Sequence, residues 1–63
     1  MNLDRAKRIC DVIVEALVGE EFSERWWTSP NRAFDGKTPD EQWELEPDVV
    51  FNYLMTYAFD GGY

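Results

Sequence analysis

The sequence has no histidine, a single cysteine and only six lysine and arginine residues among 63. The lone Cys10 cannot form a disulfide within the chain, and without histidine it cannot complete any of the usual zinc ligand sets. The chain is long enough for one domain, residues 1–63, and a domain this small normally needs a disulfide, a metal or a partner besides its core. We therefore expect a domain without a metal or cofactor, held by apolar burial and carrying surface meant for a partner.

Long apolar runs are also missing. No segment approaches the roughly 20 apolar residues that a membrane helix needs. Leu3 is followed directly by Asp4 and Arg5, so the N-terminus lacks the apolar stretch of a signal peptide. A single free cysteine is typical of a reducing compartment. These features predict a cytoplasmic protein with no membrane segment.

Cations are scarce, and the formal net charge is −7. Residues 1–18 carry three acidic and three basic side chains, whereas residues 19–63 carry ten acidic and three basic ones. This balance argues against direct binding to nucleic acid through phosphate neutralisation. It favours encounter with a basic partner, although acidity that merely keeps a tryptophan-rich chain soluble remains an equal alternative.

Acidic side chains cluster after Thr38, and we interpret them as a solvated or partner-facing stripe. A catalytic carboxylate pair needs a shielded cleft that separates the two pKa values, which a chain of this size does not easily build. Their spacing also differs from that of a calcium-binding loop. We therefore predict that the protein is not an enzyme. The stripe consists of Asp40, Glu41, Glu44, Glu46 and Asp48.

Apolar residues recur at helical spacing and predict an all-α fold, a small bundle of about four short helices with no strand. The first helix lies between a capping Asn2 and Gly19. Its apolar stripe leaves out three valines, so the helix has a second apolar side and self-association through it stays open. The stripe is Leu3, Ala6, Ile9, Cys10, Ile13, Ala16 and Leu17, and the valines off it are Val12, Val14 and Val18.

Turn and capping residues set the limits of the other helices. The second helix is expected over about residues 20–27, before Pro30. The third starts at Thr38-Pro39, where Glu41 completes a capping box, and runs to about residue 45. The fourth follows Pro47 and ends at Gly61-Gly62. A loop with proline, asparagine and glycine therefore separates the second helix from the third.

Residues 26–39 read Trp-Trp-Thr-Ser-Pro-Asn-Arg-Ala-Phe-Asp-Gly-Lys-Thr-Pro. This pattern resembles the signature of the toxin-binding domain of the Xre/MbcA/ParS antitoxins, and the resemblance covers about residues 20–60. The matching positions are Trp26, Trp27, Pro30, Asn31, Ala33, Phe34, Gly36, Thr38 and Pro39.

The resemblance implies protein binding. In that family the domain blocks the active site of a RES-type toxin, an enzyme that degrades NAD. Residues 1–19 are too short for the helix-turn-helix domain that family antitoxins usually carry, so the resemblance implies a stand-alone toxin-binding domain without operator binding. A phage or mobile-element product that uses the same scaffold against another host protein is an equally open outcome.

Two groups of candidate residues follow. Adjacent tryptophans cannot share one helical face, so we expect Trp26 in the core and Trp27 facing outward, with both absorbed by the core as the alternative. The expected partner contacts are Trp27, Arg32, Phe34, Lys37, Tyr53, Tyr57 and Tyr63. The residues expected to shape the motif are Trp26, Pro30, Asn31, Gly36, Thr38, Pro39 and Trp43, the last pointing inward.

Two functional hypotheses result. In the first, the aromatic loop and the last helix cover the active site of a partner enzyme. In the second, the acidic face mimics nucleic acid and fills the groove of a host protein that handles DNA or RNA. The loop motif favours the first, and composition favours the second.

Overall fold

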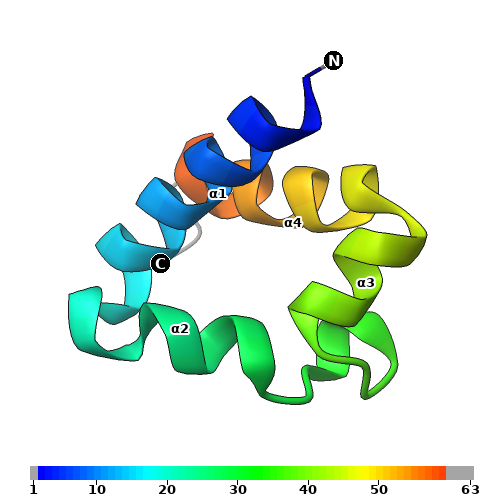
Figure 1. Cartoon of the computed structure of the whole chain (residues 1–63). Helices are drawn as coiled ribbons and strands as arrows, with labels where there is room; N and C mark the ends of the chain where they lie inside the picture. The colour runs from blue at the N-terminus through cyan, green and yellow to red at the C-terminus, as the bar shows by residue number, and fades with distance from the viewer. Residues whose placement is uncertain (1, 60–63) are drawn as a thin grey trace.

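The computed structural model describes residues 2–59, which form α1 (Leu3–Val18), α2 (Glu20–Thr28), the 3-10 turn η1 (Arg32–Phe34), α3 (Pro39–Leu45) and α4 (Pro47–Phe59). Within this range there is no strand, and the all-α prediction is confirmed. The helices follow one another around the molecule, because α1 packs against α2 and α4 while α3 packs against the same two helices (Figure 1). The predicted glycine stop at residues 61–62 and the candidate Tyr63 lie outside the described residues.

The predicted capping signals are present. The Asn2 side chain accepts a hydrogen bond from the backbone N–H of Arg5 at 3.1 Å. Gly19 ends α1 with a positive φ of 93°, which favours glycine, but its ψ of 153° lies outside the left-handed helical region expected of the stop and leads the chain directly into α2. At α3, Thr38 and Glu41 form the reciprocal capping box, and Pro39 occupies the first turn. The backbone N–H of Thr38, followed by its side chain, holds the pKa of the Glu41 carboxyl below its usual value.

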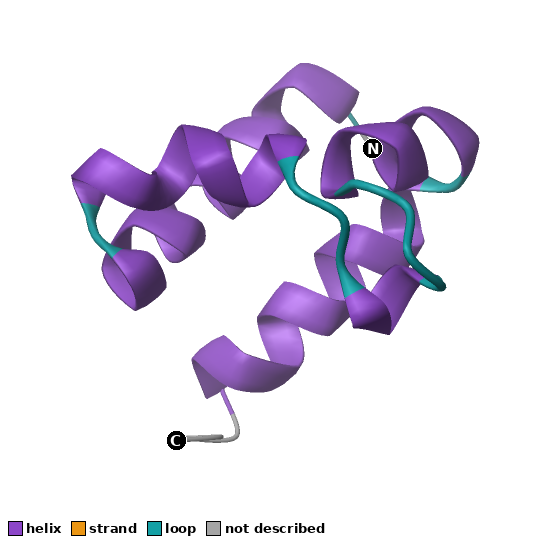
Figure 2. Cartoon of the chain, turned by 90° about the horizontal axis from the view of Figure 1, so that it is seen from below, coloured by secondary structure: helices purple, strands orange, loops and turns teal. Residues whose placement is uncertain are grey.

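The connection between α2 and α3 is the long loop of the described chain, since single residues join the other consecutive helices (Figure 2). Asn31 organises it: its side chain accepts from the N–H of Ala33 at 2.9 Å, and its carbonyl accepts from Phe34 and Gly36. The N–H of Asn31 donates to the carbonyl of Lys37 at 3.0 Å, which closes the loop on itself. The structural roles predicted for Asn31 and Gly36 (φ 83°) agree with this geometry.

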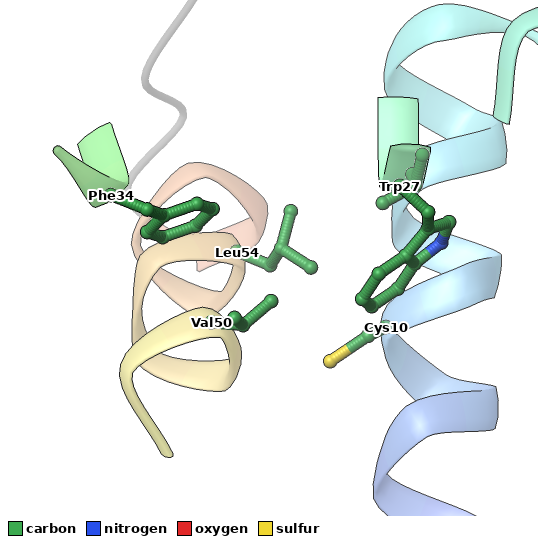
Figure 3. Close-up of a cluster of buried hydrophobic side chains, with 6 residues drawn as sticks. Cys10, Trp27, Phe34, Val50 and Leu54 are labelled. Atoms are coloured by element: carbon green, nitrogen blue, oxygen red, sulfur yellow. The ribbon is translucent and has the colours of Figure 1, made fainter. Parts of the chain in front are cut away.

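One apolar cluster fills the space between the helices, and Figure 3 shows Trp27 and Cys10 on one side facing Val50, Leu54 and Phe34 on the other. The predicted apolar stripe of α1 was wrong to leave out Val14, because the Val14 side chain is completely buried. Since both α2 and α4 pack on α1, the buried side follows Ala6, Cys10 and Val14 at steps of four. Cys10 is a small core residue, as expected. None of the described helices is long and apolar enough to cross a membrane.

Candidate partner-binding surface

Aromatic rings form a continuous chain through the molecule. Trp43 contacts Trp27, which contacts Trp26, with ring centroids 6.1 Å and 5.1 Å apart. Trp26 then contacts Phe34 at 6.4 Å, and Phe34 contacts Tyr53 at 5.3 Å. The last ring, Tyr57, lies 4.9 Å from Tyr53. Edge-to-face pairs of this kind add stability beyond the burial of their area. The contacts between successive rings therefore fix the position of the rings that are half-exposed.

Trp27 is the first correction to the predicted site. It is only 5% exposed and does not face outward. Its indole Nε1–H donates to the carboxylate of Asp11 at 2.7 Å, and the Lys7 ammonium lies 4.9 Å from the ring centroid. The physical reason is that α2 packs against both α1 and α3, so the side of α2 that carries Trp27 is covered twice. Trp26 is the half-buried member of the pair.

Phe34 is the second correction, because it is 3% exposed and therefore not placed to contact a partner. The η1 turn, begun by Asn31 and ended by Asp35 in the left-handed region at φ 57°, directs the ring between Trp26 and Tyr53. Phe34 thus anchors the loop to the core and supports those two rings from behind.

Three half-exposed rings remain at the surface on one side of this support. Trp26 from α2 and Tyr53 and Tyr57 from α4 line a hollow of about 250 Å³, together with Leu17 and Val18 at the end of α1 and the buried Leu54. Burial, followed by the contact with the Tyr57 hydroxyl, raises the pKa of the Tyr53 phenol to about 12. We call the surface formed by Trp26, Tyr53 and Tyr57 the aromatic face. Two of its members were predicted as partner contacts, and Trp26 was not.

The loop cations lie at the surface as predicted, since Arg32 and Lys37 are both exposed. Among the motif residues, Pro39 is buried, Thr38 and Trp43 are half-buried, and Pro30 is exposed. Trp43 points partly inward against Trp27, in agreement with the prediction for it.

Sequence reasoning missed a second hollow, of about 360 Å³, between the start of α1 and the junction of α3 with α4. Leu3, Trp43, Pro47, Asp48 and Phe51 line it. Leu3 belongs to the predicted apolar stripe of α1, yet it is 52% exposed at the edge of this hollow. The sequence did contain a signal for this hollow, because large apolar residues stand at both ends of the predicted helices.

The described residues contain no group of three or more histidine, cysteine, aspartate or glutamate side chains that could hold a metal ion. Within residues 2–59 the one ion pair joins the Lys7 ammonium to the Asp40 carboxylate at 3.1 Å. Each of these side chains is nearly half exposed, so the pair contributes little to stability.

Because of the Cys10 thiol, the free energy of unfolding depends on pH in the alkaline range. Burial, followed by the nearby Asp11 carboxylate, raises the pKa of Cys10 from 9.0 to about 11. The unfolded chain therefore loses this proton from about pH 9, whereas the folded chain keeps it longer, so the stabilisation is complete below pH 9 and lost as pH rises towards 11. Each unit of difference between the pKa values of the folded and unfolded chains changes the free energy of unfolding by about 1.4 kcal/mol.

We expect the urea midpoint of the protein to fall between about pH 8 and about pH 10.5, and to fall less in Cys10→Ala. The variant is less stable at every pH because of its cavity, so the comparison rests on the slope against pH. Equal slopes in the two proteins would show that Cys10 is not the titrating group.

Comparison with known proteins gives no relative: no family model, curated protein or solved structure matches this chain. The antitoxin resemblance therefore depends on the residues of the loop motif alone.

Proposed function

We propose that the chain is a protein-binding module that inhibits a partner enzyme by covering its active site, in the manner of an antitoxin, and has no catalytic activity of its own. The observation that supports this most is the aromatic face, where half-exposed tryptophan and tyrosine side chains border an open hollow. Tryptophan and tyrosine are enriched among the residues that dominate binding energy at protein interfaces.

The aromatic face is preorganised for such a role. Tyr53 is held between Phe34 and Tyr57, and Trp26 is held between Phe34 and Trp27. Rings that are already ordered lose little side-chain entropy when a partner binds, so more of the contact energy appears as affinity. Arg32 and Lys37 add exposed positive charge on the loop that carries Phe34.

The partner implied by the loop motif is a RES-type enzyme that degrades NAD, or another host protein if a phage or mobile element has reused the scaffold. Such a partner would act in the cytoplasm, where the reducing conditions suit a lone thiol. The proposal includes no direct contact with nucleic acid.

The acidic mimic is the second candidate, and one observation favours it. Residues 38–59 contain five carboxylates and no lysine or arginine. Among them, only Asp40 forms an ion pair within the described residues. A mimic of nucleic acid would bind through this unpaired charge and not through the aromatic face.

A pull-down from the host cytoplasm with a tagged chain, at about 0.05 M and about 0.5 M salt, separates the two candidates. The aromatic face predicts a partner that remains bound at high salt and is lost with Tyr57→Ala. The mimic predicts a partner that is lost at high salt, and lost with Glu44→Lys and Glu46→Lys in one chain. Glu41 is left unchanged because its carboxylate caps α3. Retention of the same partner by the Tyr57→Ala variant at high salt would contradict the proposed function.

A further inference from the structure

A second surface lies on the outer side of α1, away from the aromatic face. Ile9 is 42% exposed, Val12 is 63% exposed, and Ala16 is also exposed. These residues are three and four positions apart, so they form one stripe on the helix, on the side away from the buried Val14. We call Ile9, Val12 and Ala16 the outer stripe. We propose that the outer stripe binds a second copy of this chain, with the two α1 helices antiparallel.

Charge is the argument for a second copy. Two chains that each carry −7 repel each other over most of their surfaces. The segment 1–18 is different, because its three acidic and three basic residues balance. Contact through α1 therefore joins two copies at a segment whose own charges cancel, so this segment adds no net charge to the interface.

The order of charges along α1 fits an antiparallel pair. Arg8 and Glu15 are seven residues apart, so they lie along the same edge of the outer stripe, with the cation nearer the start of the helix. Both side chains are exposed, and none of the described hydrogen bonds or ion pairs involves them. When the helices run in opposite directions, Arg8 of each copy faces Glu15 of the other, and the opposed helix dipoles are also favourable. A twofold axis then makes both contacts at once.

The surface beside the stripe offers space for the partner. A hollow of about 240 Å³ lies between α1 and α4, lined by Asn2, Arg5, Ala6, Ile9 and Phe51. With Arg8 opposite Glu15, Val12 of one copy lies at the level of Asp11 of the other, so the two Val12 side chains lie next to each other beside the twofold axis. The stripe is short, so the interface falls in the size class below about 1,200 Å², and the dimer depends on protein concentration.

Sedimentation equilibrium of the full chain tests the proposal. The apparent mass should rise from 7.4 kDa towards twice that value as the concentration increases to about 1 mM. Val12→Glu should stay at the monomer mass over the same range. Leu45→Glu is the matched control, because Leu45 is also 63% exposed and the substitution adds the same charge on α3. It should associate as the unchanged chain does.

Charge exchange tests the antiparallel arrangement. Arg8→Glu alone and Glu15→Arg alone each place like charges opposite each other, and each should weaken association by about tenfold or more. The double variant restores opposite charges and should recover it. A monomer mass for the unchanged chain at every concentration would overturn the proposal, as would equal loss in Leu45→Glu and Val12→Glu. Failure of the double variant to recover would overturn the antiparallel pairing. The outer stripe does not line the aromatic hollow, so these results are independent of the proposed function.

Discussion

Replacing Trp27 with alanine is expected to remove about 3–5 kcal/mol from the free energy of unfolding. The side chain is 5% exposed, and its loss also leaves the Asp11 carboxylate without its indole donor. A chain of 63 residues has a total stability of only about 3–9 kcal/mol. Trp27→Ala should therefore be largely unfolded at room temperature, as measured by urea titration with far-ultraviolet circular dichroism.

Phe22→Ala is the matched control for this prediction. Phe22 is an aromatic residue of the same helix, but it is 51% exposed. Its replacement should change the free energy of unfolding by less than about 1 kcal/mol. If Trp27→Ala were as stable as Phe22→Ala, the packing of α2 between α1 and α3 would be wrong.

Replacing Phe34 with alanine should have an effect of similar size, about 3–5 kcal/mol. Phe34 is 3% exposed and is the contact through which the α2–α3 loop reaches Tyr53 of α4. Its removal leaves a cavity between Trp26 and Tyr53 and releases both rings from their support. The near-ultraviolet circular dichroism of the aromatic residues should weaken together with the urea midpoint.

The neighbouring Arg32 provides the control for the loop. It belongs to the same η1 turn and is exposed, so Arg32→Ala should alter stability by less than about 0.5 kcal/mol. A similar loss in the two variants would indicate that the turn itself, and not the anchoring ring, determines stability.

The sequence was sufficient for features that depend on neighbouring residues. Asn2 caps the residue three positions on, Thr38 and Glu41 cap each other, and Asn31 holds a turn of a few residues. All of these contacts are local, so spacing and residue type predict them. The four helices and the loop before α3 follow from the same local signals.

The choice between Trp26 and Trp27 could not be made in this way. Both are large and apolar, and their burial depends on which helices pack against α2. The partner that fixes Trp27 is Asp11, 16 positions earlier, and the ion pair beside it joins residues 33 positions apart. The same applies to Val14, which is buried because α1 packs against two other helices. The prediction of Trp27 and Phe34 as partner contacts was therefore wrong about their exposure, whereas the half-exposed Tyr53 and Tyr57 remain candidates.

We propose that the aromatic face binds and inhibits a partner enzyme. For the NAD-degrading partner that the loop motif implies, the direct measurement is NAD turnover by a purified RES-type enzyme with increasing amounts of this chain. We expect full inhibition by the unchanged chain. Tyr57→Ala should raise the inhibitory concentration by about thirtyfold, the cost of losing one dominant interface residue. Asn52→Ala, an exposed change on the same helix outside the hollow, should inhibit as well as the unchanged chain. Turnover that stays unaffected at every concentration, or equal inhibition by all three proteins, would contradict the claim.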